Sequence, residues 1–228
     1  MKSLYIPSAV FKIGQQIEVQ DDDYHHLVVV SRIKKNEEVL LLNGSGEAFL
    51  SKIIDITKKN LKLEVSQVKT SQIRPRHSVM ILIPKKESLD LMIKSCVELA
   101  VKEIILVRGD HSVERLPDDR KIAKMIKQAI EQSNSYYHHR LTQAHLKEFN
   151  FSLYSSVNIL DLNGQEGKIK NEAGENELLL VGPEGGFSES EKSFFQTIHN
   201  AKYISFPTNI LRAPTALIAG LGWLYAKN

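Results

Sequence analysis

The first 72 residues carry their hydrophobic side chains in short runs rich in Val, Ile and Leu, and polar turns separate these runs. The runs at 39–42, 48–56 and 60–68 predict three strands that follow one another as a meander. Asn43-Gly44 is typical of a hairpin turn, and Asp21-Asp22-Asp23 also has the composition of a turn. A sheet this small leaves its edges open unless it closes on itself, so the pattern predicts a small antiparallel β-barrel.

The pattern changes after Arg74-Pro75-Arg76, where short β-type runs begin to alternate with segments whose apolar residues recur every three to four positions. This alternation predicts a mostly parallel sheet with helices on both faces. The division expected is therefore a domain at 1–72 and an α/β domain at 73–228, with an exposed polar loop at 164–176. The predicted strands of the second domain are 79–83, 104–107, 157–162, 178–181 and 203–206.

Four helices are expected in the second domain: one between the predicted strands 79–83 and 104–107, one after Asp118, one that begins at Ser188, and one at 215–225. The last is rich in small apolar residues and is either deeply buried or part of a subunit interface. The first helix has one apolar stripe, formed by Leu89, Met92, Ile93, Cys96, Val97 and Ala100. In the second helix Ile122, Ile126, Ala129 and Ile130 face inward, whereas Arg120, Lys121, Lys124 and Lys127 face outward or flank that side.

The segment Gly182-Pro183-Glu184-Gly185-Gly186 ends the predicted strand 178–181, and Ser188 with Glu191 forms a capping box that starts a helix. In parallel α/β folds, ligands bind beyond the carboxyl ends of the strands, where glycines let a ligand approach the backbone. The alternative is a turn that needs positive φ and has no other role. The segment matches neither a phosphate-binding P-loop nor the dinucleotide fingerprint.

A second loop, 207–214, follows the predicted strand 203–206 and precedes the C-terminal helix. Pro214 occupies a position where a first-turn proline is favoured. Arg212 would place a fixed charge beside the free N–H groups of the helix start, an arrangement that suits a carboxylate or a phosphate. The alternative is a surface arginine that pairs with a carboxylate.

Composition excludes several classes of protein. The chain has no apolar run near the roughly 18 residues that cross a bilayer, its N-terminus lacks a signal-peptide pattern, and one cysteine cannot form an intramolecular disulfide. A cytoplasmic protein without a membrane role is therefore expected. The net charge of +3 is spread evenly, because 1–72 carry ten Lys/Arg and nine Asp/Glu. A small net charge is weak support for a nucleic-acid partner, because a surface that binds nucleic acid has its basic residues clustered in a patch.

Two further features have competing interpretations. The cluster Tyr136-Tyr137-His138-His139-Arg140 either stacks on RNA bases or forms a partly buried helix end. Its adjacent histidines do not predict a metal site, because no Cys or carboxylate cluster accompanies them. Cys96 lies on the apolar stripe and is interpreted as core packing.

Taken together, the two loops resemble those of the SPOUT methyltransferases, whose C-terminal chain forms a trefoil knot. More narrowly, the chain resembles the family that methylates N3 of a uridine in small-subunit (16S) ribosomal RNA, which joins a PUA-like barrel to a knotted catalytic domain. The resemblance spans the whole chain. Its matching segments are His25-His26 with Arg32, Pro84-Lys85, Val97-Glu98-Leu99-Ala100-Val101, Glu131-Gln132-Ser133, Gly182-Pro183-Glu184-Gly185-Gly186 and Ile210-Leu211-Arg212.

This resemblance implies an S-adenosylmethionine-dependent enzyme that acts as a homodimer on ribosomal RNA or the small ribosomal subunit, without a metal. Arg212 would stabilise the uridine anion, and Glu184 would act as a base or contact the cofactor's ammonium group. The implied cofactor site comprises Leu160, Gly182, Pro183, Gly185, Gly186, Pro207, Asn209, Ile210, Leu211 and Thr215. Candidate RNA contacts are His26, Arg32, Lys34, Lys35, Arg74, Arg76, Lys85 and Lys86, each of which could instead be a solvated surface charge.

The chain departs from the family pattern at three places. Ala213-Pro214-Thr215 follows Arg212 where the family has Thr-Glu-Thr, Ser95 replaces a lysine, and the arginine expected after Ser133 is absent from its place. Arg140 is the candidate substitute for that arginine. Two other functions therefore stay open: a knotted RNA-binding protein with weakened catalysis, and a SPOUT enzyme of other specificity, such as ribose 2′-O-methylation.

Overall fold

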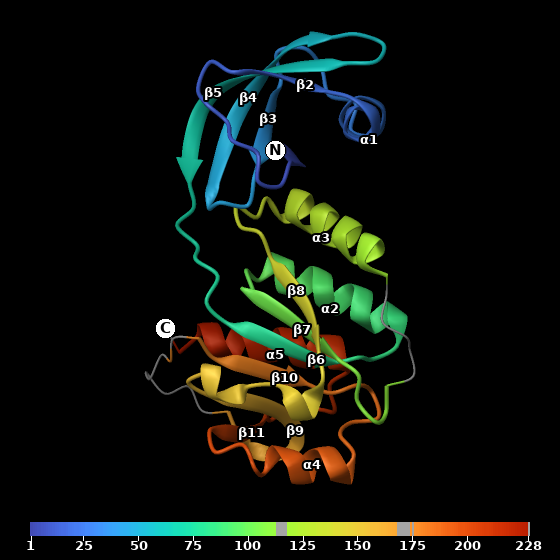
Figure 1. Cartoon of the computed structure of the whole chain (residues 1–228), viewed down its shortest axis with the longest axis vertical. Coiled ribbons are helices and arrows are strands. Elements are labelled where there is room, and N and C mark those ends of the chain that lie inside the picture. The colour runs from blue at the N-terminus through green and yellow to red at the C-terminus, as the bar shows by residue number, and fades with distance from the viewer. Residues whose placement is uncertain (113–117, 168–173, 175, 228) are drawn as a thin grey trace. The chain divides into compact units, whose positions relative to one another are not determined.

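The computed structural model describes residues 1–112, 118–167, 174 and 176–227. The chain divides into two compact units, drawn in Figure 1. The first unit is Met1–Arg74 with Lys127–His138, and the second is Pro75–Ile126 with His139–Asn228. Helix α3 (Asp119–Ser133) begins in the second unit and ends in the first. The boundary predicted at residue 72 does not account for Lys127–His138, which belong to the first unit.

The sheet of the first unit contains the predicted meander. Strands β3, β4 and β5 pair antiparallel in chain order, as expected. The order of the sheet is β1-β3-β4-β5-β2, and β1 runs parallel to β3. The sheet curls into a half-barrel, which agrees with the predicted small barrel-type domain. It differs from the expected closed antiparallel sheet in two details, since β1 and β2 form open ends and the β1–β3 pair is parallel. The strands are β1 (Lys2–Tyr5), β2 (Gln16–Val19), β3 (Glu38–Leu42), β4 (Glu47–Ile56) and β5 (Leu61–Thr70).

A short helical segment in the first unit was not predicted. The acidic run interpreted as a turn forms α1 (Asp21–Tyr24), and the π-helix η1 (His25–Val30) follows it. Acidic side chains are favourable in the first turn of a helix, and Leu27 is buried against the sheet. The core of the unit contains Leu4, Phe11, Val19, Leu27, Ile33, Val39, Leu41, Phe49, Ile53, Leu61, Leu63 and Val65.

The second unit contains a six-stranded sheet in the order β11-β9-β10-β6-β7-β8, and every pairing in it is parallel. The parallel sheet and five of its strands are as predicted, whereas β8 is an addition. The strands are β6 (Ser78–Leu82), β7 (Glu103–Val107), β8 (Arg140–Ala144), β9 (Val157–Glu166), β10 (Leu178–Val181) and β11 (Ala201–Ser205).

Strand β9 is longer than the predicted strand 157–162. Tyr203 of β11 pairs with Ile159 and the next residue, Ile204, pairs with Gln165, so residues 160–164 bulge between these two positions. Residues 164–166 are therefore strand, which corrects the expected loop at 164–176. Residues 168–173 and 175 of that loop lie outside the described residues.

Helices cover both faces of this sheet. On one face Phe187 and Phe195, from the start and end of the α4 region (Glu189–Phe195), pack against Leu178 and Leu180. On the other face Gly220 of α5 (Ala213–Tyr225) approaches Leu179, because neighbouring strand residues point to opposite sides. Helix α2 (Lys86–Glu98) packs against α5. The 3-10 turns η2 (Leu146–Glu148) and η3 (Phe151–Leu153) join the α4 side.

The predicted helical stripes are largely confirmed. Cys96 is fully buried in α2, where burial raises the pKa of its thiol, and this supports core packing. Ala100 belongs to the loop after α2 and has φ of 52°, so its place on the stripe is corrected. The inward residues of α3 are buried, namely Ile122, Ile126, Ala129 and Ile130.

Candidate functional site

The carboxyl ends of the six strands of the second unit lie at one edge of its sheet, because all the strands run in the same direction. The loops after β6, β7, β10 and β11 therefore leave the sheet at this edge. This is the place where parallel α/β folds bind ligands. Both loops that the sequence singled out lie there.

The glycine turn, residues 182–186, connects β10 to the start of α4. Gly186 has φ of 68°, and its N–H donates to the carbonyl of Pro183 over 2.9 Å. A Cβ at Gly182 would lie 3.0 Å from the Phe187 ring, so any larger residue would require this ring to shift by a few tenths of an ångström. The predicted capping box is confirmed, since the Ser188 hydroxyl accepts from the Glu191 N–H at 3.1 Å and Glu191 accepts from the Ser188 N–H at 2.8 Å.

Glu184 is held by the loop after β6 and by the first turn of α2. Its carboxylate accepts from the Ser88 hydroxyl at 2.6 Å and from the Lys85 backbone N–H at 3.3 Å. Partial burial by itself raises the pKa of Glu184, but the hydrogen bonds from Ser88, its own backbone and Lys85 outweigh it, so the pKa is lowered. A carboxylate stabilised in its ionised form is a poor proton acceptor. The geometry therefore favours a charge contact over a base for this residue.

The second loop, residues 206–212, is exposed along most of its length. Ile210 is 80% exposed, which is unusual for an apolar side chain of this size. Among the described backbone hydrogen bonds, none is donated by residues 209–212. Arg212 is the N-cap of α5, and Pro214 lies in the first turn as predicted. Exposed apolar and unpaired amide groups of this kind suit a ligand with both apolar and polar parts.

Leu160 connects the two predicted loops. Strand β9 lies between β10 and β11, so Leu160 sits between the strands from which the two loops depart. A Cβ placed on Gly220 would lie 3.0 Å from a methyl group of Leu160, which shows that this side chain packs toward α5. The predicted cofactor residues of both loops are thus gathered around one stretch of the sheet edge, with Thr215 exposed in the first turn of α5.

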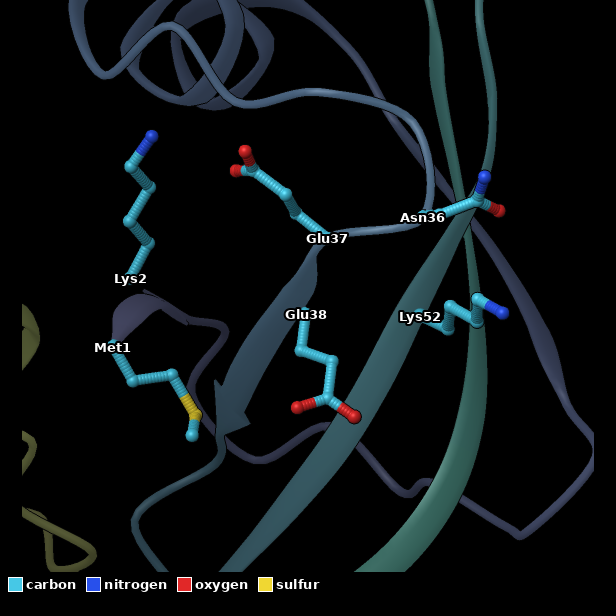
Figure 2. Close-up of a pocket in the computed structure, with 6 residues that line it drawn as sticks. All are labelled: Met1, Lys2, Asn36, Glu37, Glu38 and Lys52. Carbon is cyan, nitrogen blue, oxygen red and sulfur yellow. The ribbon is translucent and has the colours of Figure 1, made fainter.

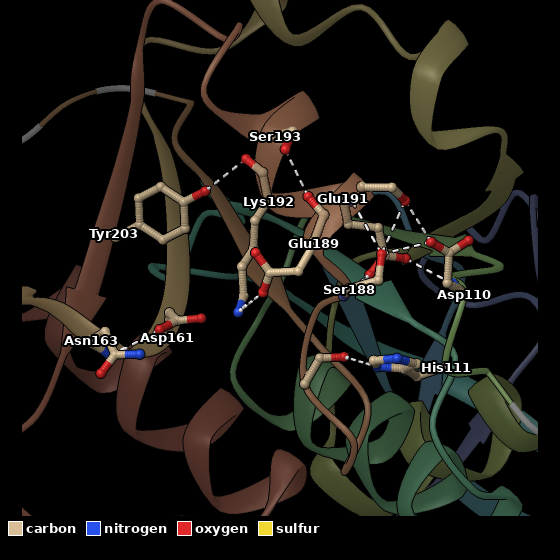
Figure 3. Close-up of polar contacts among 12 residues, drawn as sticks. Asp110, His111, Asp161, Asn163, Ser188, Glu189, Glu191, Lys192, Ser193 and Tyr203 are labelled. Carbon is tan, nitrogen blue, oxygen red and sulfur yellow. Dashed lines mark hydrogen bonds and ion pairs between the residues drawn. The ribbon is translucent and has the colours of Figure 1, made fainter.

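A third loop was missed by the sequence analysis. Residues 108–112 follow β7, and Figure 3 shows Asp110 and His111 of this loop beside the start of α4. Gly109-Asp110, one residue beyond the end of a buried strand, is the signal that could have identified it, since every such strand end reaches the same edge.

The candidate RNA-binding residues are split between the units. His26, Arg32, Lys34, Lys35 and Arg74 are exposed on the first unit. In the second unit Arg76 is exposed, and Lys85 and Lys86 are exposed at the start of α2, where Lys85 adjoins the glycine turn through Glu184.

A recess of about 790 Å³ lies on the first unit, and Figure 2 shows its lining residues. Two acidic side chains, Glu37 and Glu38, line it together with Lys2 and Lys52. This mixed charge does not favour phosphate, and none of the candidate RNA-binding residues is part of the lining.

The tyrosine–histidine cluster is not a helix end, since α3 ends at Ser133. Instead this segment supports the turn between β3 and β4. Tyr137 forms an isolated β-bridge with Ser45, and a Cβ on Gly46 would lie 2.8 Å from the Tyr137 ring. The Tyr5 hydroxyl and the His138 ring are hydrogen-bonded at 2.9 Å. These contacts give the cluster a structural role.

The three departures from the family pattern can be located in the structure. Ser95 and Pro214 are buried, in α2 and in the first turn of α5. Arg140, the candidate substitute for the missing arginine, starts β8 and forms an ion pair with Glu103 at 3.4 Å. Within the described residues, no group of three or more His, Cys, Asp or Glu side chains could hold a metal ion, and no helix is long and apolar enough to cross a membrane.

Comparison with known proteins gives the same two-part organisation. Residues 72–225 match the RNA methyltransferase domain family, and residues 19–66 match the RNA methyltransferase PUA domain family. The chain is 29% identical to ribosomal RNA small subunit methyltransferase E of Rickettsia conorii, across 96% of this chain and 92% of that protein. It is 30% identical to ribosomal RNA small subunit methyltransferase E 2 of Borreliella burgdorferi, across 93% of this chain and 92% of that protein.

Solved structures share the fold. A ribosomal RNA small subunit methyltransferase E from Neisseria gonorrhoeae bound to S-adenosylmethionine superimposes with a TM-score of 0.85 at 22% identity, covering 97% of this chain and 95% of that chain. A Legionella pneumophila structure described as a methyltransferase with bound cofactor SAM gives a TM-score of 0.86 at 24% identity, covering 98% and 96%. With a domain match over most of its length, the chain belongs to the family of RNA methyltransferases that carry a PUA domain before the methyltransferase domain.

Proposed function

We propose that this protein transfers the methyl group of S-adenosylmethionine to N3 of a uridine in small-subunit (16S) ribosomal RNA. The main support for the proposal is that the glycine turn and the 206–212 loop leave the sheet at the same edge. The relatives named ribosomal RNA small subunit methyltransferase E support the RNA substrate, and the structures with bound cofactor support the methyl donor. The choice of uridine N3 rests on the resemblance of the motifs.

The residues present fit this cofactor. Gly186 has open space where a Cβ would stand, so a ligand can approach the backbone of the turn. The N–H groups of residues 209–212, which donate no backbone hydrogen bond within the described part of the chain, offer donors for a carboxylate or an adenine ring, and exposed Ile210 offers an apolar contact. The carboxylate of Glu184, kept ionised by Ser88 and Lys85, suits the cofactor's ammonium group. S-adenosylmethionine supplies a methyl group on a positively charged sulfur.

The remaining work of the site is positioning and charge stabilisation. Uridine N3 carries a weakly acidic proton on the pairing edge, so the base must be unpaired or flipped out before it can react. N3 gives its proton to solvent water, and Arg212, an exposed guanidinium at the start of α5, stabilises the resulting anion. The N3–CH3 bond forms as the S–CH3 bond breaks, and S-adenosylhomocysteine leaves. Backbone groups of the two loops hold the donor in line with N3.

In this proposal the candidate RNA-binding residues contact the RNA in two groups. Lys85 and Lys86 adjoin the glycine turn and neutralise phosphates near the target nucleotide. His26, Arg32, Lys34, Lys35 and Arg74, with Arg76 of the second unit, hold other parts of the RNA. We assign 1–72 to RNA binding and 73–228 to methyl transfer, and we place the reaction in the cytoplasm, with a homodimer as the active form.

The test is methylation by the purified protein in the presence of S-adenosylmethionine. Small ribosomal subunits and naked small-subunit RNA from a strain that lacks this activity serve as substrates, and nucleosides are separated by mass spectrometry. The expected product is 3-methyluridine. A 2′-O-methylated nucleoside would replace the proposed specificity with ribose methylation. Cofactor binding in calorimetry without any methylated product would indicate an RNA-binding protein with weakened catalysis.

A further inference from the structure

We propose that Asp110 and His111, on the loop after β7, are positioning residues that hold the glycine turn in shape for its ligand. The part of this inference that concerns the cofactor rests on the proposed function. The part that concerns the shape of the turn rests on contacts within the second unit alone. Neither residue belongs to a sequence motif that the function already uses.

Asp110 fastens the loop to the first turn of α4. Its backbone N–H donates to Glu191 over 2.8 Å, and one carboxylate oxygen accepts from the hydroxyls of Ser188 and Ser190, each at 2.6 Å. Figure 3 shows these contacts around the start of the helix. The hydrogen bonds from Ser188 and Ser190 hold the pKa of Asp110 below its ordinary value. The carboxylate therefore stays ionised throughout the neutral range, and its hydrogen bonds remain charge-assisted.

His111 extends this attachment to the glycine turn. Its Nδ1 lies 3.1 Å from the carbonyl oxygen of Gly186. A carbonyl only accepts, so Nδ1 carries the proton and donates it. A Cβ placed on Gly185 would lie 3.4 Å from the Cβ of His111, so the histidine also covers one side of the turn.

The close fit of the loop requires a glycine at its start. A Cβ on Gly109 would lie 2.6 Å from the carboxylate of Glu191 and 2.9 Å from a methyl group of Leu82. The Gly109 N–H donates to the Ser112 hydroxyl at 3.0 Å, which folds the loop back on itself. The loop is thus built to lie against the start of α4, although Asp110 and His111 themselves are exposed.

These contacts matter because a glycine turn has more conformational freedom than any other kind of turn. Within the described residues, the one backbone hydrogen bond inside this turn is Gly186 N–H to Pro183. The turn is otherwise tied from two sides: Glu184 to the loop after β6, and Gly186 to the loop after β7. Fixing the turn before a ligand arrives removes an ordering cost from binding. His111 should therefore act on affinity rather than on methyl transfer.

The test compares His111→Ala with His111→Asn. Asparagine can place its amide N–H near the position of Nδ1, so it keeps the donor to Gly186, whereas alanine removes it. For His111→Ala we expect S-adenosylmethionine to bind about five-fold or more weakly, the scale of one hydrogen bond, and kcat at saturating cofactor to stay within about three-fold. His111→Asn should bind within about two-fold of the unchanged chain. His199→Ala, at an exposed histidine outside these loops, is the matched control.

Hydrogen exchange gives a measurement that does not depend on the proposed function. Without any ligand, His111→Ala and Asp110→Ala should speed amide exchange at Gly185, Gly186 and Phe187, and the melting temperature should stay within a few degrees. If exchange is faster but the unchanged chain binds no S-adenosylmethionine, the positioning role stands and the proposed function fails. Unchanged exchange and affinity in His111→Ala would overturn the inference. A loss of kcat with unchanged affinity would also overturn it, because His111 would then act in transfer.

Discussion

At the scale of single residues, Arg212 carries the most specific expectation. It is exposed at the N-cap of α5, as the last residue of the loop proposed to hold the cofactor. A charge that stabilises an anion formed only during transfer affects the transition state more than ground-state binding. We therefore expect Arg212→Ala to reduce turnover by roughly 100-fold or more, while cofactor affinity in calorimetry stays within a few fold.

The controls for this substitution separate transfer from binding. Arg120→Ala, at an exposed arginine of α3, should leave both quantities unchanged. Single-turnover measurements at saturating S-adenosylmethionine report the transfer step directly. A variant of Arg212 that lost cofactor affinity but kept its single-turnover rate would assign the arginine to the binding site instead.

His77 gives a pH-dependent prediction. It is 1% exposed, and neither ring nitrogen has a hydrogen-bond partner among the described residues. Burial lowers the pKa of His77; Glu177 opposes this shift, whereas Lys227 and Arg76 add to it. Because the folded pKa is below the unfolded value, the unfolded chain takes up a proton first as the pH falls. The stability that neutral His77 provides is present above about pH 6.5 and is lost as the pH falls below that value.

Thermal unfolding between pH 7.5 and 5 checks this expectation. His77→Phe keeps an aromatic ring against Tyr225 but cannot be protonated. As the pH falls, the melting temperature of the unchanged chain should therefore drop further than that of His77→Phe, by an amount on the order of a few degrees. His199→Phe, at an exposed histidine, should follow the unchanged chain. Equal slopes for the unchanged chain and His77→Phe would refute the assignment.

At the scale of elements, the sequence predicted structure well where the residues that determine an element are neighbours in the chain. The strand 178–181, the glycine turn and the capping box at Ser188 are confirmed because each depends on neighbouring residues. Strand β8 was missed because it is an edge strand with polar residues such as Thr142 and Gln143. Segment η1 was missed because a single π-helical turn is too short for periodicity to show.

Strand β9 gives the prediction at this scale. A Cβ on Gly164 would lie 2.7 Å from backbone atoms of Ile204, so no side-chain movement can relieve the contact. Gly164→Ala should separate β9 from β11 and lower the free energy of unfolding by roughly 2 kcal/mol or more. Urea unfolding measures the change, and Asn163→Ala, at the exposed neighbouring residue, should stay within about 0.5 kcal/mol of the unchanged chain. A Gly164→Ala chain as stable as the control would mean that the two strands are not paired so closely.

At the scale of the whole molecule, the sequence predicted which kinds of domain are present but not how the chain is distributed between them. Residues 127–138 return to the first unit, and no composition shift marks this return. The same limit applies to the candidate site. The rule that parallel strands end at one edge predicted that the glycine turn and Arg212 lie at the same edge. The loop of Asp110 contacts the start of α4 and the glycine turn through residues more than 70 positions away in the sequence, so no local pattern reveals it. The expectation of a trefoil knot rests on family resemblance, because periodicity carries no information about threading.

The proposed homodimer gives the last prediction, and it concerns helix α5. One side of this helix is buried in its own unit, through residues that include Leu217, Leu221 and Leu224. The other side leaves Ile218 44% exposed and Gly222 with open space where a Cβ would stand. An exposed side made of small and apolar residues suits close contact with a second copy.

Ile218→Glu should therefore shift the chain from dimer to monomer at micromolar concentration in sedimentation equilibrium. Leu153→Glu makes the same kind of change at an exposed leucine of η3, on the α4 side of the sheet, and should leave the dimer intact. An unchanged chain that sediments as a monomer would remove the dimer from the proposed function, and an Ile218→Glu chain that stays dimeric would move the interface away from α5.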